Sequence, residues 1–120
     1  MTDLPTVDWK TTAWPGVRLA FLADRDDGSA CVLIEMAPGV GYPAHRHRGP
    51  EEVLVVRGSY SDGDGEYPEG TFQRNEADSS HHPIAGPEGA LLLAWSEEGI
   101  EVLDENPAEE DAVAGVANKE

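Results

Sequence analysis

The four histidines lie in two short clusters, and the spacing of three of them favours a metal site. His45 and His47 are separated by Arg46, and residues two apart on a β-strand point to the same side. Both imidazoles would therefore enter the interior together, while Arg46 faces outward. After a short turn, Glu51 can point inward at the start of the next strand. A fourth ligand must then come from a neighbouring strand that is distant in sequence, and His81 is available.

Three imidazoles and one carboxylate form a mixed nitrogen and oxygen donor set. Such a set suits Zn, Fe, Mn, Co or Ni better than Ca or Mg, which prefer oxygen alone. The carboxylate of Glu51 can bind the metal or serve as a base, or it can stay behind the ligands and orient a histidine. Only one of the adjacent residues His81 and His82 can face inward on a strand, and the spacing selects His81. The alternative for His45 and His47 is a pair of surface histidines.

The composition limits the class of protein. A chain of 120 residues fits one domain. Its net charge of −16 repels phosphate backbones and anionic lipid surfaces, so nucleic acid and membranes are poor partners. The single cysteine, Cys31, lies in an apolar run and is interpreted as a small buried residue. The N-terminus lacks the basic start and apolar stretch of a secretion signal, which predicts a cytoplasmic protein.

Short apolar segments separated by turn residues predict an all-β fold of the sandwich or barrel type. We expect strands near 17–23, 30–37, 42–47, 52–57, 70–73, 80–84, 90–95 and 100–103. Asp-Gly pairs at 26–28 and 62–65 predict tight hairpins. Segments such as 91–95 are apolar on both faces, so something must cover the outer face of a small barrel. A second subunit, a second sheet or the N-terminal arm with Trp9 and Trp14 would do this, and we expect a homodimer.

The segment from Gly39 to Gly58 resembles the first motif of the cupin family. That motif has a Gly, five residues, His-x-His, three or four residues, Glu, six residues and Gly, and all its positions fit. In the second motif Gly70 and His81 have the right separation, while other residues stand at the usual Pro, Gly and Asn positions, namely Glu76, Asp78 and Ala85. The resemblance implies a jelly-roll barrel, or double-stranded β-helix. We assign this cupin barrel to 15–105, between an N-terminal arm at 1–14 and an acidic, flexible tail at 106–120.

Within the cupins, the chain looks like the ChrR-type branch. The likeness rests on His45, His47, Gly49, Glu51, Glu52, Gly58, Asp62, Gly65, Tyr67, Gly70 and the segment 79–83. In that branch the cupin often forms the C-terminal half of an anti-sigma factor, behind a zinc-binding helical domain. A neighbouring cupin group contains iron-dependent dioxygenases that cleave β-diketones with three histidine ligands, and those ligands map to His45, His47 and His81.

These resemblances imply two functions. The first is a metal-dependent, dioxygenase-like enzyme that acts on a small dicarbonyl or carboxylic compound, with one ion held by His45, His47, Glu51 and His81. Zn or Fe(II) is expected ahead of Mn, Ni or Co, and Glu51 is the candidate catalytic group. The alternative is a non-catalytic zinc-binding sensor in which a bound small molecule changes contacts with a partner protein.

Overall fold

The computed structural model describes residues 7–103, which contain ten β-strands and no helix. The strands are β1 (Lys10–Thr11), β2 (Val17–Asp24), β3 (Ala30–Met36), β4 (His45–His47), β5 (Glu51–Ser61), β6 (Glu66–Pro68), β7 (Phe72–Asn75), β8 (Ser80–His81), β9 (Ile84–Ser96) and β10 (Ile100–Val102). This confirms the expected all-β class. The expected acidic tail lies outside the described residues. Among residues 7–103, no helical segment has the length and hydropathy needed to cross a bilayer.

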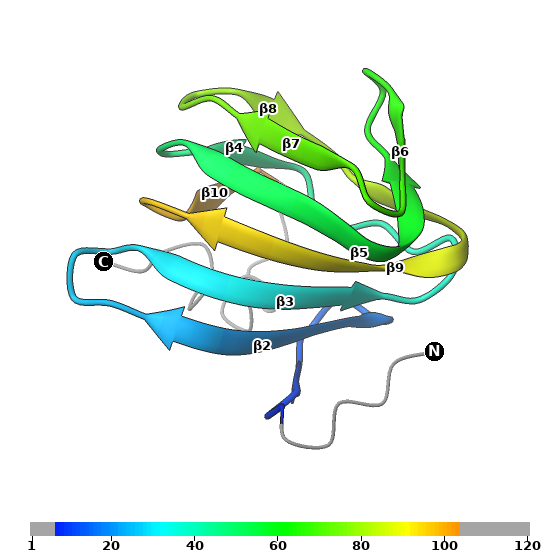
Figure 1. Cartoon of the computed structure of the whole chain (residues 1–120), viewed down its shortest axis with the longest axis horizontal. Helices are drawn as coiled ribbons and strands as arrows, with labels where there is room; N and C mark the ends of the chain where they lie inside the picture. Colours follow the sequence, from blue (N-terminus) through cyan, green and yellow to red (C-terminus); the bar gives the residue numbers. More distant parts are fainter. Residues whose placement is uncertain (1–6, 104–120) are drawn as a thin grey trace.

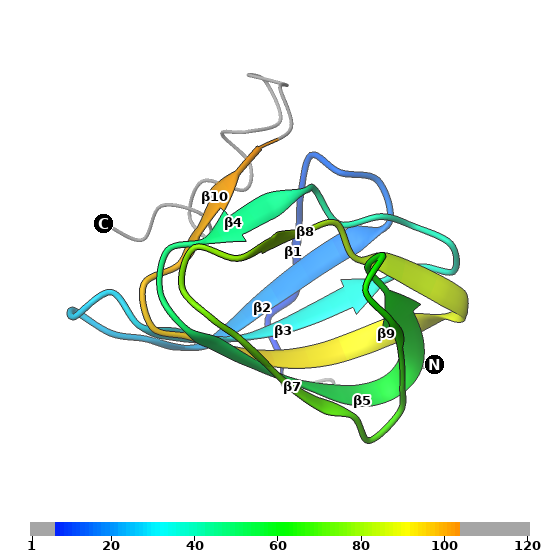
Figure 2. The same cartoon turned by 90° about the horizontal axis from the view of Figure 1, so that it is seen from above.

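The strands form two antiparallel sheets that face each other across the interior (Figures 1 and 2). The large sheet has the order β1-β2-β3-β9-β5-β6, and β7 also pairs with β5. The small sheet has the order β10-β4-β8, so β4 lies between a strand from the C-terminal part of the chain and one from its middle. The central position of β4 holds the segment with the two histidines rigidly at one end of the barrel.

The main core lies between the sheets, because each strand of the large sheet turns alternate apolar residues inward. It is built mainly from aliphatic residues of β2, β3, β5, β9 and β10, together with two tyrosines. Its buried members are Val17, Leu19, Ala30, Val32, Ile34, Met36, Tyr42, Val53, Val55, Tyr60, Ala85, Ala90, Leu92, Ala94 and Ile100. This packing fills most of the interior and leaves a small cavity beside the histidines.

A second apolar cluster lies on the outer face of the large sheet. Ala20, Leu33 and Leu91 are buried there under Val7 and Trp9 of the N-terminal arm. The arm therefore covers part of the outer face, as expected for Trp9. The expectation for Trp14 is wrong: Trp14 follows β1, and its side chain packs against the main core instead.

Most strand boundaries differ from the expected ones; β9, for example, begins at Ile84 rather than at 90, and β5 extends to Ser61. The segment 80–84 is not one strand, because β8 ends at His81 and β9 begins at Ile84. Pro83 stands between them, and proline has no N–H to donate to a sheet. The short strands β1 and β6 were not expected from the sequence, since each has only two or three residues and no apolar alternation.

Candidate metal centre

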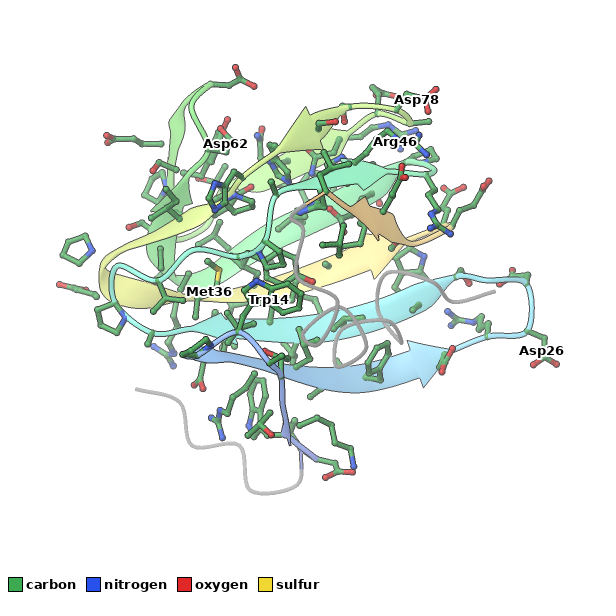
Figure 3. All side chains as sticks on the ribbon, turned by 180° about the vertical axis from the view of Figure 1, so that it is seen from behind. Trp14, Asp26, Met36, Arg46, Asp62 and Asp78 are labelled. Atoms are coloured by element: carbon green, nitrogen blue, oxygen red, sulfur yellow. The ribbon has the colours of Figure 1, made fainter. Side chains whose placement is uncertain are left out.

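Strand β4 turns two imidazoles into the barrel. His45 and His47 are 3% and 1% exposed, and their ring centroids are 4.9 Å apart. Arg46 points away on the other side of β4, where it forms salt bridges with Asp78 and Glu101 (Figure 3). The alternation expected from the sequence is therefore confirmed, and the alternative of two surface histidines is wrong.

His81 joins this pair from the neighbouring strand. It lies on β8 in direct register with His45, and their Nε2 atoms are 3.0 Å apart. Its ring centroid is 4.6 Å from that of His45 and 4.8 Å from that of His47. The three imidazoles offer ligand atoms that all lie within 4.8 Å of one another, so this cluster can hold a single metal ion.

Hydrogen bonds fix which nitrogen of each ring carries the proton. The Nδ1 atom of His45 lies 2.9 Å from the carbonyl oxygen of Pro43, and that of His47 lies 3.0 Å from the carbonyl of Ser79. The Nδ1 atom of His81 lies 2.9 Å from a carboxylate oxygen of Asp62. Carbonyl and carboxylate oxygens only accept, so each Nδ1 donates. In the neutral ring the Nε2 lone pair is then free, and the three lone pairs converge.

Glu51 brings a negative charge to the edge of the three-histidine cluster, beside His47. Its Oε1 atom lies 3.1 Å from Nε2 of His47 and accepts a hydrogen bond of 3.4 Å from Asn75. Nε2 of His47 is buried and has no hydrogen-bond partner among the described residues. Lone pairs and a carboxylate held this close repel one another unless a cation lies between them. The residues present therefore fit a divalent metal with nitrogen and oxygen ligands.

The protonation states suit metal binding at neutral pH. Burial, followed by repulsion from His81, lowers the pKa of His45 to about 4. Burial also lowers the pKa of His81, even though the Asp62 carboxylate opposes this. Burial alone would raise the pKa of the Glu51 carboxyl, but the imidazoles around it, His47 first, bring that pKa below its usual value. The site thus presents neutral imidazoles from His45 and His81 beside an anionic carboxylate.

A cavity of about 40 Å³ opens beside the cluster. His45, Glu51 and His81 line it together with inward-facing apolar residues of the large sheet, such as Ile34 and Leu92. No lysine or arginine is among the described residues that line it. The cavity therefore suits a compact ligand with an apolar body, and it offers no side-chain counter-charge to a polyanion.

The remaining sequence predictions near the site have clear outcomes. His82 is exposed, and its ring lies beside Gly41, so it does not join the cluster. Glu52 faces away and pairs with Arg74 at 3.4 Å, one of the partners expected. Sequence reasoning missed the second layer of contacts: Asp62, Ser79 and Asn75 bind the candidate ligands from loops and a neighbouring strand. Asp62 and Ser79 carried a signal, because both belong to the ChrR-type pattern.

A family model described as the ChrR cupin-like domain matches residues 1–98, most of the chain. The chain belongs to this family. The ChrR cupin-like chain shares 28% identity, with a TM-score of 0.71, with a chain from the Rhodobacter sphaeroides SigE complex with the anti-sigma ChrR. That match covers 78% of this chain and 51% of the other, so our chain spans about half of that relative's length.

Other solved structures share the cupin fold at lower identity. A putative acetylacetone dioxygenase from Methylibium petroleiphilum PM1 is 20% identical, with a TM-score of 0.75, over 98% of this chain and 93% of that one. An acetylacetone dioxygenase from Acinetobacter johnsonii is 14% identical, with a TM-score of 0.73, over 88% and 78%. Identities this low show the fold alone. No curated protein matches the ChrR cupin-like chain.

Proposed function

We propose that this ChrR cupin-like protein is a mononuclear metalloenzyme of the dioxygenase type, which acts on a small dicarbonyl or carboxylic compound. The observation that carries the proposal is the convergence of three Nε2 lone pairs and the Glu51 carboxylate at the end of an apolar cavity. Fe(II) is the metal proposed for this activity. A bound divalent ion would supply Lewis-acid chemistry and, if redox-active, oxygen chemistry.

The chain's own residues have defined roles in this proposal. His45, His47 and His81 hold the ion through Nε2, with Nδ1 anchored to protein oxygens. Glu51 either completes the ligand set or accepts a proton from a bound ligand, because its carboxyl group is anionic at neutral pH. The apolar walls bind the ligand's carbon skeleton and exclude water. The absence of a lysine or arginine from the described lining favours a dicarbonyl over a multiply charged acid.

A second candidate function is a non-catalytic zinc-binding sensor. The family match and the 28% identity to a chain from the SigE–ChrR complex favour it. In this version the same four side chains hold zinc, and a small ligand in the cavity alters contacts with a partner protein. The two candidates differ in the metal they need and in whether oxygen is consumed.

Metal content and oxygen uptake discriminate between the two functions. Protein purified without added metal is analysed for bound elements, then loaded anaerobically with Fe(II) or Zn(II) and exposed to oxygen with a panel of small β-diketones and short carboxylic acids. We expect oxygen uptake with the Fe(II)-loaded protein and a dicarbonyl, and none with the Zn(II)-loaded control. Tightly held native zinc and no uptake with any compound would refute the enzyme and favour the sensor.

Substitution of Glu51 by glutamine then separates the two roles of this residue. If the carboxylate is a ligand, Glu51→Gln weakens metal binding. If it is a base, the variant keeps its metal and loses turnover.

We also propose that the protein is a homodimer that associates through the outer face of the large sheet. Leu54 on β5 pairs in register with Leu93 on β9 and Phe72 on β7, so an apolar row crosses three strands. Leu54 is 37% and Phe72 61% exposed, and Trp95 lies beside this row at 39%. Of the described part of the arm, Val7 and Trp9 pack on the adjoining cluster, at whose edge Leu93 lies.

Charge favours a second copy as the occupant of this face. Around this row the outward charged side chains are mixed in sign: Arg18 pairs in register with Glu35, Arg74 with Glu52, and Arg57 lies opposite Leu91. The whole chain carries −16, so two copies repel each other least where these faces meet. The row spans three strands about 4.8 Å apart. The same sheet face of a second copy is wide enough to cover it.

Replacing Phe72 by glutamate is expected to convert the dimer to a monomer, because it buries a charge against the apolar row. Light scattering coupled to gel filtration measures the mass. Ile84→Glu is the matched control, since Ile84 is an exposed apolar residue near the opposite end of β9 and should leave the mass unchanged. A parent protein that is monomeric at high concentration would refute the dimer. The cytoplasmic location expected from the sequence stays a prediction.

A further inference from the structure

The hairpin between β5 and β6 brings a second acidic group to the candidate metal centre. Asp62 follows the last residue of β5, and its side chain is only 4% exposed. Its Oδ2 atom lies 2.9 Å from Nδ1 of His81. Its Oδ1 atom accepts hydrogen bonds from the Tyr67 hydroxyl at 3.1 Å and from the Asp64 amide at 3.0 Å. The carboxylate is therefore fixed in place by donors on both of its oxygens.

The bond from Asp62 distinguishes His81 from the other two imidazoles. Nδ1 of His45 and Nδ1 of His47 donate to neutral acceptors, the carbonyls of Pro43 and Ser79. Within residues 7–103, only the Nδ1 of His81 is bonded to a carboxylate. A carboxylate makes the imidazole a stronger electron donor at Nε2 and fixes both the tautomer and the angle of the ring.

A local role for Asp62 in the turn does not account for these contacts. An aspartate that accepts from the amide two residues later is a common turn feature and needs one oxygen. Here that oxygen is Oδ1, and Oδ2 is directed at His81 on another strand. Tyr67 from β6 adds a bond to Oδ1, and its ring packs on Tyr60 of the core with centroids 4.9 Å apart. Tyr67 therefore links the Asp62 carboxylate to the packed core and helps to hold it against His81.

We infer that Asp62 is a positioning residue of the metal centre: it holds His81 as the Nδ1–H tautomer, aims Nε2 at the ion, and strengthens metal binding. This inference rests on the metal site of the proposed function. Tyr67 acts one step further out by holding Asp62. With Glu51, the Asp62 carboxylate supplies the two negative charges that balance a divalent cation in a buried site.

The charge state of Asp62 agrees with this role. Burial alone would raise the pKa of its carboxyl group. The hydrogen bonds from His81, the Asp64 amide and Tyr67 have the larger combined effect, so the pKa lies below its usual value. Asp62 is therefore an anion at neutral pH and accepts a hydrogen bond from Nδ1–H of His81.

Replacing Asp62 by asparagine tests the inference, because the change keeps the size of the side chain and removes its charge. Binding of Co(II) and Zn(II) is measured by competition with a chelator, and the Co(II) absorption spectrum reports the geometry of the ligands. We expect affinity to fall about 10- to 100-fold and the spectrum to change. Tyr67→Phe, which keeps the carboxylate but removes one bond to it, should have a smaller effect in the same direction.

Asp64→Asn is the matched control. It makes the same change of charge in the same hairpin, but the Asp64 side chain is exposed and only its backbone amide contacts Asp62. The affinity of the Asp64→Asn variant for Co(II) and Zn(II) should stay within about twofold of that of the parent. Nitrogen NMR of the metal-free imidazoles adds a readout that a purely structural role would not move: His81 should lose its fixed Nδ1–H tautomer in Asp62→Asn and keep it in Asp64→Asn.

The outcomes separate this inference from the metal site itself. If the parent binds Co(II) and Asp62→Asn binds it equally well with an unchanged spectrum, Asp62 has no positioning role. If the parent binds no divalent metal, the proposed metal site fails, and this inference fails with it. If Asp62→Asn does not fold, Tyr67→Phe decides: an affinity and a His81 tautomer equal to those of the parent would refute the inference.

Discussion

Replacing His81 by alanine is expected to lower the affinity for Zn(II) or Co(II) by at least about 100-fold. Structural zinc sites with four ligands bind with roughly 10–16 kcal/mol, so one ligand contributes about 3 kcal/mol, and each 1.4 kcal/mol is a factor of ten. His81 also contributes one of the three converging Nε2 atoms. The Kd from chelator competition measures the effect, and metal content after dialysis supports it.

The adjacent His82 provides the control. His82→Ala removes the same chemical group one position away, but that side chain is exposed and outside the cluster. The variant should bind metal like the parent. The buried Asp62 keeps its bonds from Tyr67 and Asp64 in His81→Ala, so the barrel should remain folded. Equal affinities for His81→Ala and His82→Ala would contradict the assignment of the ligands.

Replacing Gly58 by alanine should destabilise the fold by at least about 4 kcal/mol, as measured by urea unfolding of the metal-free protein. Gly58 has φ +74°, a conformation that L-residues rarely adopt. A Cβ there would overlap the carbonyl oxygen of Gly89 and lie 2.8 Å from its carbonyl carbon. Both atoms belong to the backbone of β9, so relief requires β5 and β9 to separate.

Gly39 is the matched control, because its φ is +73° and nothing lies within 4 Å of the position of its Cβ. Gly39→Ala carries the conformational cost without the overlap, about 1–2 kcal/mol. The difference between the two variants isolates the close approach of β5 to β9. A loss of stability for Gly58→Ala no larger than for Gly39→Ala would show that the two strands part easily at this point.

The sequence predicts the part of the site that follows from strand periodicity. The inward pair His45 and His47, with Arg46 outward, needs only the alternation of a strand. Adding His81 required the motif spacing, because no local pattern states that residues 36 positions apart lie in register. The same spacing excluded His82, and the structure confirms that it is exposed.

The contacts behind the ligands could not be predicted from the sequence, because they depend on how loops pack against strands. Asp62 contacts His81 from the hairpin between β5 and β6, and no sequence pattern relates these two segments. The side-chain direction of Trp14 is likewise set by a turn, whose backbone path no periodicity specifies. The break at Pro83 could have been predicted from the sequence, because a proline inside an expected strand argues against that strand.

Strand β5 begins at Glu51, and Asp62 directly follows its last residue. If its eleven residues were straight, they would extend about 36 Å, yet carboxylates from both ends contact the same group of imidazoles. Irregular pairing with β9 between Val55 and Arg57, and again between Gly58 and Tyr60, accompanies the strong curvature of the strand in Figure 2. The separation of the two carboxylates is therefore an outcome of backbone bending. A change in that bend would move Glu51 and Asp62 relative to the imidazoles without replacing any residue that contacts them.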